Sequence, residues 1–174
     1  MRRNSVQFLV AFVLFAACAL VVARRIVPVP SPGRLLSPGA AFPPLAVSGW
    51  INEPGPTQLD GAVTVVDVWA YWCPDCRHEM PAMVATYEKY QDRGVRFIGL
   101  TQEDGAEGVV KTEKAVRDDH APWPTAYGAG RMMPILGVTS IPTLFVIGRD
   151  GRVVWNSDRG GTLNEAIESA LAQR

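Results

Sequence analysis

The chain has 174 residues, 48% of them apolar, and it carries 17 basic and 17 acidic side chains, so its formal net charge is zero. This length fits one globular domain with a short additional segment, and the balanced charge argues against a nucleic-acid-binding domain, which normally has a basic excess. The three cysteines are too few for a disulfide-stapled scaffold, so the fold must be held together by burial of apolar side chains.

An uncharged apolar run covers residues 6–23, with Gln7 as its one strongly polar residue. A helix of this length spans roughly 27 Å, which is just enough to cross a bilayer. Because the run is slightly longer than the apolar core of a cleaved signal peptide, we expect an uncleaved signal anchor over residues 1–25, with cleavage after Ala23 as the alternative. Arginines flank both ends of the run, and their balance only slightly favours placing the rest of the chain outside the cytoplasm.

A proline-rich stretch follows the apolar run. Residues 28–44 hold six of the fourteen prolines. Proline fixes φ and removes a backbone donor, so this stretch is expected to be an extended, stiff spacer. The sequence therefore predicts a linker over residues 26–41 and one folded domain over residues 42–174.

Strand-like and helix-like segments alternate after Trp50. Apolar periodicity and turn signals predict, in chain order, a strand at 63–69, a helix at 74–92, a strand at 95–101, a helix at 106–120, strands at 143–147 and 152–155, and a helix at 162–172. The first strand is apolar on both faces, as in a central strand covered from both sides. Asp150-Gly151 is a hairpin signal between the last two strands. This order predicts an α/β domain with a mixed central sheet and helices on both faces.

The first strand and the first helix are joined by Trp72-Cys73-Pro74-Asp75-Cys76. Two cysteines separated by two residues in this context are typical of a redox pair, because a structural zinc site would need two further ligands at suitable spacing. Pro74 suits the first helical position, which puts Cys73 at the cap, where free N–H groups and the helix dipole favour a thiolate. Cys73 is thus the predicted nucleophile. Cys76, one turn further along, is the predicted, less exposed resolving thiol.

These residues carry a family resemblance. The stretch Val65 to Cys76, with Pro81 shortly after it and Ile141-Pro142-Thr143 before the hairpin, resembles the thioredoxin superfamily. The apolar N-terminal run and the stretch Gly39 to Leu45 more closely resemble the membrane-anchored TlpA/ResA/CcmG-type thiol-disulfide oxidoreductases. The resemblance covers roughly residues 39–172 and implies a thioredoxin-like fold.

The resemblance also implies a substrate-binding surface. Pro142 matches the family's cis-proline, which would turn the backbone of Ile141 outward to pair with an extended substrate strand beside the reactive sulfur. An ordinary trans proline at a strand start is the alternative. Trp72 is expected to shield the site. The predicted substrate-binding residues are Trp72, Pro74, Ile141 and Pro142.

Two acidic residues are candidates for proton transfer. Asp67 lies inside an apolar strand, where its pKa should be raised, and it matches the buried acid of thioredoxin that is proposed to accept the proton of the second cysteine. Glu79, one helical turn after Cys76, matches an acid typical of ResA-like proteins. The alternatives are a satisfied core carboxylate for Asp67 and a solvated helix charge for Glu79. Arg77 and His78 are expected to be solvated.

By resemblance, the expected function is that of an extracytoplasmic oxidoreductase in the cytoplasmic membrane, with its catalytic domain facing the periplasm. It would act as a monomer and exchange the Cys73–Cys76 disulfide with thiol client proteins, for example in cytochrome c maturation. A membrane electron donor would re-reduce it, and no organic cofactor or metal is expected. The negative charge of Asp75 should raise the pKa of Cys73, which favours a reductant. The alternative is a Cu(I)-relay protein that binds the metal through the reduced cysteine pair.

Overall fold

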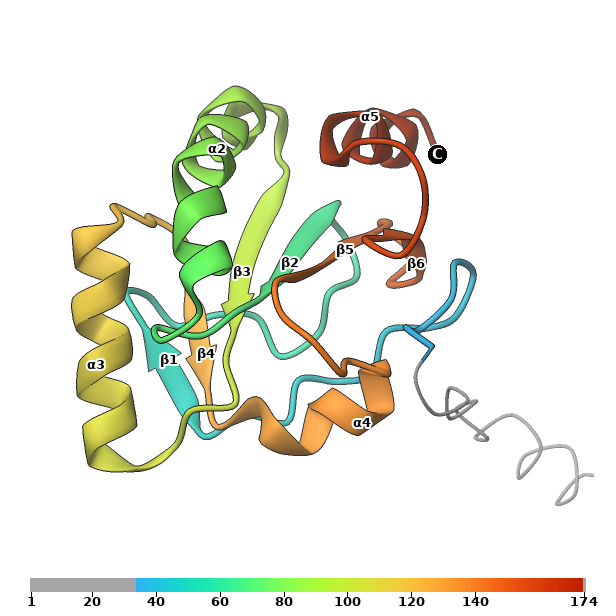
Figure 1. The fold of residues 1–174 in the computed structure, drawn as a ribbon. Helices are drawn as coiled ribbons and strands as arrows, with labels where there is room; N and C mark the ends of the chain where they lie inside the picture. Colours follow the sequence, from blue (N-terminus) through green and yellow to red (C-terminus); the bar gives the residue numbers. More distant parts are fainter. Residues whose placement is uncertain (1–33, 174) are drawn as a thin grey trace, which may run out of the picture.

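A computed structural model describes residues 34–173 of the protein (Figure 1). Six strands form one sheet in the order β1-β4-β3-β2-β5-β6. The elements are, in chain order, β1 (Gly49–Ile51), β2 (Thr64–Val68), α2 (Pro74–Tyr90), η1 (Gln91–Arg93), β3 (Arg96–Leu100), α3 (Gly105–Asp118), β4 (Thr125–Tyr127), η2 (Ala129–Arg131), α4 (Met132–Leu136), β5 (Thr143–Ile147), β6 (Val153–Asn156) and α5 (Leu163–Ala172).

The sheet is mixed, as the sequence predicts. Strands β2, β3 and β4 run parallel to one another, whereas β1 is antiparallel to β4, and β5 is antiparallel to both β2 and β6. All five residues of β2 are buried, because this strand lies at the centre of the sheet and is covered on both faces.

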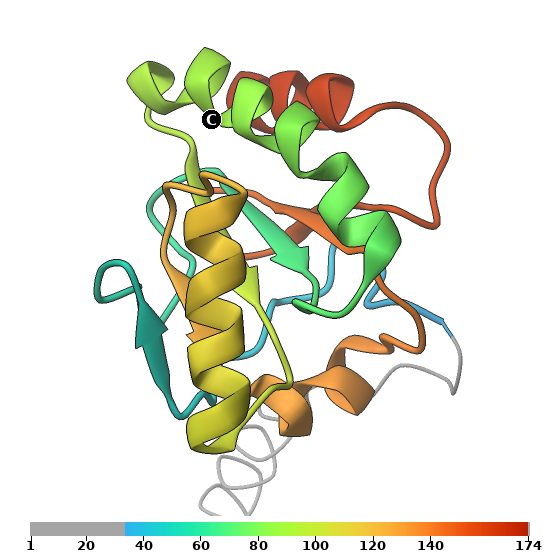
Figure 2. The same cartoon turned by 60° about the vertical axis from the view of Figure 1, so that its left-hand side comes forward.

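Helices cover both faces of the sheet, which confirms that part of the predicted architecture. Side chains of α2, α3 and α5 form one buried cluster with Val65 and Trp69. Side chains of α4 and of the segment before β1 form a second cluster with Val66 and Val68. The arrangement can be followed in Figures 1 and 2, where α2 and α5 lie near each other and α4 lies apart from them.

Helix α2 begins and ends where the sequence signals lie. Pro74 is its first residue, Cys73 is its N-cap, and the 3-10 turn η1 that continues it ends at Gly94, whose φ of 75° is in the left-handed region. Its buried face consists of Cys76, Met80, Met83 and Tyr90. The remaining predicted helices and strands agree with the structure to within one or two residues at each end.

Two short strands and one short α-helix were not predicted. Strands β1 and β4 have three residues each, and α4 has five residues with Pro134 among them. Segments this short do not complete the apolar repeat on which recognition of a strand or a helix depends. The structure therefore adds β1 and β4 at one edge of the sheet and α4 before β5.

The folded part of the chain begins before Phe42, because residues 35–41 of the predicted linker pack against the domain. Leu35 and Leu36 are buried, and the N–H of Leu36 donates to the carbonyl of Leu136 at 2.8 Å. Ala41 forms a bridge with Arg152 beside β6. The predicted anchor over residues 1–25 lies outside the described residues, and none of the helices within residues 34–173 is long and apolar enough to cross a membrane.

Candidate active site

Two loops meet at one end of the sheet. Strand β2 leads into the cysteine loop at its carboxyl end, and β5 begins just after Pro142. Because β2 and β5 are antiparallel neighbours with Val68 opposite Thr143, the end of one strand lies beside the start of the other. The topology therefore brings the cysteine loop and the Ile141-Pro142 segment to the same place.

The two cysteines form a disulfide with an S–S distance of 2.07 Å. The backbone N–H of Cys76 donates to Sγ of Cys73 at 3.2 Å, and the N–H of Cys73 donates to the carbonyl of Ala70 at 3.1 Å. Cys73 thus caps α2 with its sulfur, in the N–H environment that stabilises a thiolate.

The expected difference in exposure between the two cysteines is absent from this disulfide-bonded form. The exposed fractions are 4% for Cys73 and 3% for Cys76. What separates the two residues is their position on α2, since Cys73 lies at the cap and Cys76 lies inside the first turn, in the row of buried residues.

Asp67 is a buried acid in the centre of the sheet, with an exposed fraction of 5%. Its pKa is raised from 3.8 to about 7, first because burial disfavours the charged form and second because the Glu79 carboxylate repels a second negative charge. Glu79 itself is exposed on α2. A carboxyl group that titrates near neutral pH can accept a proton and release it again under physiological conditions.

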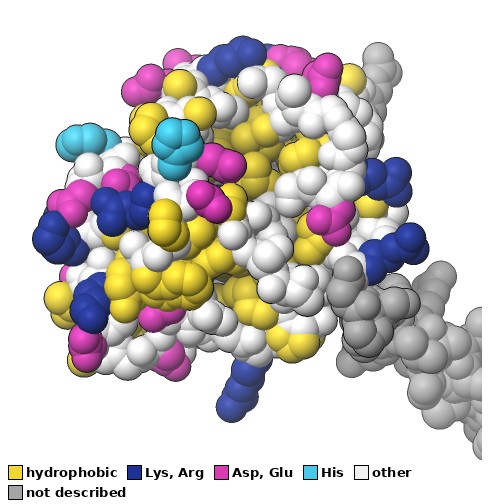
Figure 3. All heavy atoms as spheres, viewed as in Figure 1, with side chains coloured by type: hydrophobic (Ala, Val, Ile, Leu, Met, Phe, Trp, Pro, Cys, Tyr) yellow, Lys and Arg dark blue, Asp and Glu magenta, His cyan; other side chains and the backbone are white. Residues whose placement is uncertain are grey.

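A groove runs beside the cysteine loop. It is a cavity of about 360 Å³, lined by Val68, Trp69, Trp72, Gln102, Met133, Val138, Thr139, Ser140 and Ile141. Its lining is mostly apolar, and Figure 3 shows apolar side chains gathered on this face of the molecule near the start of α2. The groove brings together Trp72 and Ile141, two of the four predicted substrate-binding residues.

The other two predicted substrate-binding residues lie outside the groove lining. Pro74 is exposed at the start of α2, and Pro142 is half-buried. The peptide bond between Ile141 and Pro142 is cis. The roles of all four residues in substrate binding are still predictions.

Trp72 is fixed by a contact that the sequence analysis missed. Its side chain is 50% exposed, and its Nε1–H donates to Oε1 of Glu103 at 2.8 Å. Glu103 and Gln102 follow β3, whose carboxyl end lies next to that of β2 because the two strands are parallel. Polar residues just after a parallel strand are a general indication of a binding site, and that signal could have identified them.

Arg77 is only partly solvated, because it pairs with an acidic side chain. Its Nη2 donates to Oδ1 of Asp119 at 2.7 Å, and the guanidinium and carboxylate form an ion pair. The contact joins the first turn of α2, directly after Cys76, to the C-cap residue of α3. The two residues are 42 positions apart, so helical periodicity could not reveal this pairing.

A cysteine pair at the start of a helix that follows a central strand, with a cis-proline before the neighbouring antiparallel strand, defines a protein of the thioredoxin superfamily. Residues 49–170 match the family described as Redoxin. This match covers more than half of the chain, so the protein belongs to that family.

Similar proteins agree with this assignment. The chain is 31% identical over 115 residues to the thiol-disulfide oxidoreductase ResA of Bacillus thuringiensis subsp. konkukian, covering 66% of this chain and 64% of ResA. It therefore spans slightly less than two thirds of that relative. A crystal structure from Chlorobium tepidum, provisionally described as the thiol:disulfide interchange protein DsbE, has a TM-score of 0.62 and 27% identity, covering 79% of this chain and 99% of the other.

A third similarity is more local. The protein DipZ of Mycobacterium bovis is 36% identical over 72 residues, which cover 38% of this chain and 10% of DipZ. The similarity therefore concerns only a small part of DipZ.

Proposed function

We propose that this protein is an extracytoplasmic, membrane-tethered thiol-disulfide oxidoreductase that acts as a reductant of client proteins. The single observation that carries the proposal is the disulfide between Cys73, at the cap of α2, and Cys76, one turn further into the helix. The buried Asp67 and the apolar groove add support from the same end of the sheet. The similarity to ResA supports the same class of reaction.

The first step would be attack by the reduced protein on a client disulfide. The Cys73 thiolate forms a bond to one client sulfur, the client S–S bond breaks, and the other client sulfur leaves as a thiolate that takes up a proton. The cap position suits this role because backbone N–H groups face the sulfur. The product of this step is a mixed disulfide through Cys73.

The second step would release the client. Asp67, with its pKa raised to about 7, accepts the proton of the Cys76 thiol. The Cys76 thiolate then attacks Sγ of Cys73, the mixed disulfide breaks, and the second client sulfur leaves as a thiol after protonation. Two electrons pass from the protein to the client. A dithiol donor, which we place in the membrane, would restore the reduced pair.

The groove suggests how a client would be bound. An extended client strand would lie along the backbone of Ile141, with one of its side chains between Trp72 and Met133. The apolar lining favours clients that are unfolded around the cysteine, since folded proteins bury such side chains. Apocytochrome c is one client of this kind, consistent with the expected role in cytochrome c maturation.

Trapping the mixed disulfide tests the proposed reaction. In a Cys76→Ser variant expressed in its native membrane, the second step is blocked, and we expect Cys73-linked adducts with exported proteins on non-reducing gels. A Cys73→Ser variant is the matched control and should form no such adducts. Absence of adducts in Cys76→Ser would contradict the proposal. Tight Cu(I) binding by the reduced wild-type protein together with that absence would instead support the metal-relay alternative.

A topology reporter tests the compartment. A reporter that is active only outside the cytoplasm should be active when fused after Ile26. The same reporter fused before the apolar run, at Asn4, is the control and should be silent. If the reporter is inactive in both fusions, the extracytoplasmic assignment is contradicted. This conclusion does not depend on the outcome of the trapping experiment.

A further inference from the structure

Three residues lie side by side across the parallel part of the sheet. Asp67 of β2 is in register with Gly99 of β3, and Gly99 is in register with Thr125 of β4. Residues in register on neighbouring strands point to the same face of a sheet. Asp67 and Thr125 therefore stand on either side of a position that has no side chain.

The indole of Trp69 lies over this position. A Cβ atom added to Gly99 would be 2.9 Å from Nε1 of Trp69 and 2.7 Å from Oγ1 of Thr125. Both distances are shorter than real Cβ contacts allow, so a side chain at residue 99 would displace the indole or the threonine. Gly99 is thus required for space at this point of the sheet.

The two polar atoms that meet above Gly99 are both buried. The exposed fractions are 2% for Trp69 and 0% for Thr125, and neither Nε1 nor Oγ1 has a hydrogen-bond partner among residues 34–173. An indole N–H can only donate, whereas a hydroxyl can accept. Both atoms lie within 3 Å of the position that a Cβ atom of Gly99 would take, and neither has a direct partner among the described residues. One water molecule between them would satisfy both, with the hydroxyl of Thr125 on its other side.

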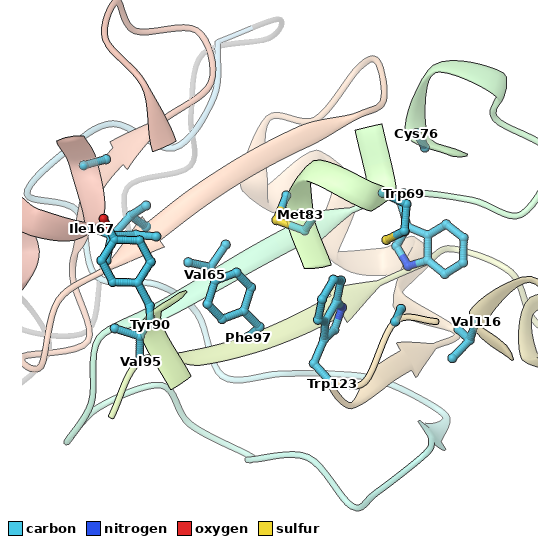
Figure 4. Close-up of a cluster of buried hydrophobic side chains, with 14 of the residues drawn as sticks. Val65, Trp69, Cys76, Met83, Tyr90, Val95, Phe97, Val116, Trp123 and Ile167 are labelled. Carbon is cyan, nitrogen blue, oxygen red and sulfur yellow. The ribbon is translucent and has the colours of Figure 1, made fainter. Parts of the chain in front are cut away.

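Trp69 connects this polar pair to the candidate active site. It lines the groove, and it belongs to the same buried cluster as Cys73 and Cys76. Figure 4 shows Trp69 and Cys76 in this cluster. A rotation of its indole would change the shape of the groove floor without touching either sulfur atom directly. We therefore expect the orientation of this side chain to affect client binding more than the chemistry of the cysteines.

We propose that Gly99 and Thr125 are positioning residues that hold the Trp69 indole beside the groove, Gly99 by leaving space and Thr125 through a water molecule that links its hydroxyl to Nε1. The functional part of this inference rests on the proposed oxidoreductase activity. The structural part, the water-mediated link between Thr125 and Nε1, does not depend on that activity and can be measured separately.

The test compares two substitutions of Thr125 in the full-length protein, reduced and kept in detergent micelles. Thr125→Val keeps the shape of the side chain but removes the hydroxyl, whereas Thr125→Ser keeps the hydroxyl. The indole signals are recorded by ¹H–¹⁵N NMR, and Trp69→Phe identifies the signal of Trp69. We expect Thr125→Val to move the Trp69 indole proton upfield, because the water molecule that accepts from Nε1 loses its second partner, whereas Thr125→Ser should keep the wild-type position.

Kinetics provide the second readout. We expect Thr125→Val to raise the KM for a disulfide-containing peptide several-fold at unchanged kcat, and to leave the rate with the small disulfide 5,5′-dithiobis(2-nitrobenzoate) unchanged. Gly99→Ala should raise the KM in the same way. A Trp69 signal and a KM that stay at their wild-type values in Thr125→Val would overturn the inference. If the wild-type protein fails to reduce the peptide, the proposed function is wrong, and the NMR measurement alone decides the positioning role.

Discussion

The two faces of the central strand β2 differ in what they bury. Val66 and Val68 point into the cluster formed with α4 and the N-terminal segment, where their neighbours are apolar. Asp67 and Trp69 point the other way, toward α2 and the cysteines, where a carboxyl group is kept at a raised pKa of about 7. One face of the strand therefore stabilises the fold by apolar burial. The other face carries the energetic cost of a buried carboxyl group, which the proposed proton transfer would use.

The largest effect is expected on the apolar face. Phe145 is fully buried there and packs edge-on against Phe42 with ring centroids 5.8 Å apart. Phe145→Ala should lower the free energy of unfolding by about 3 to 5 kcal/mol, because the substitution loses burial and leaves a cavity. Urea unfolding measures this. Ile135→Ala, at a 36% exposed position, is the control and should cost much less.

On the other face of β2, replacing Asp67 is expected to raise the free energy of unfolding rather than lower it. Its pKa is about 7 in the folded protein and 3.8 without the protein environment, so the folded state holds its proton more tightly. Between pH 4 and pH 7 the wild-type protein therefore loses stability as the pH rises, and above pH 7 the loss is complete. Asp67→Asn avoids this loss and should raise the free energy of unfolding at pH 8 by about 2 to 4 kcal/mol.

The gain from Asp67→Asn should disappear below about pH 3, where the wild-type carboxyl is protonated in both the folded and the unfolded state. Urea unfolding of both proteins at several pH values measures it. Glu79→Gln is the matched control: it removes the neighbouring charge, so it should lower the pKa of Asp67 only slightly, since burial is the larger cause. A gain of equal size at pH 3 and pH 8 would show that the carboxyl does not titrate as described.

A smaller effect is expected for the ion pair that joins α2 to α3. The side chains of Arg77 and Asp119 are 36% and 13% exposed, so their interaction is partly shielded from water. A double-mutant cycle with Arg77→Ala and Asp119→Ala should give a coupling energy of about 1 kcal/mol. The exposed pair Arg93–Glu168 is the control and should couple more weakly. Equal coupling energies in the two pairs would show that partial burial does not strengthen the Arg77–Asp119 interaction.

The smallest effect on stability is expected at the groove rim. Glu103→Ala removes the acceptor of the Trp72 indole in an exposed contact and should change the free energy of unfolding by less than about 0.5 kcal/mol. Because the freed indole no longer holds one wall of the groove, the KM for a disulfide peptide should rise. Steady-state kinetics measure this, with Glu107→Ala on the outer side of α3 as the control. An unchanged KM would show that the fixed position of the Trp72 indole does not contribute to client binding.

The sequence predicted the long elements and the cysteine pair because each carries a strong local signal. Apolar periodicity marks β2 and α2, and the Cys73-Pro74 step marks the helix cap. Asp67 also carries a local signal, since it is a charged residue that interrupts an apolar strand.

What the sequence did not reveal depends on contacts between distant residues. The pairing of Arg77 with Asp119 and the contact of Trp72 with Glu103 each join separate elements, and so does the approach of Trp69 and Thr125 to Gly99. No spacing along the chain encodes them. The equal burial of Cys73 and Cys76 was missed because it follows from how the whole loop packs in the disulfide-bonded form.

The segment before β1 covers the outer edge of β6. The N–H of Gly39 donates to the carbonyl of Val153 at 2.8 Å, and the N–H of Val153 donates to the carbonyl of Ala40 at 2.9 Å. An uncovered strand edge invites pairing with a second molecule. Since residues 39 and 40 occupy these backbone groups, sheet-to-sheet association of two copies through this side is blocked, and a shortened chain that starts at Phe42 would lose this protection and become prone to self-association.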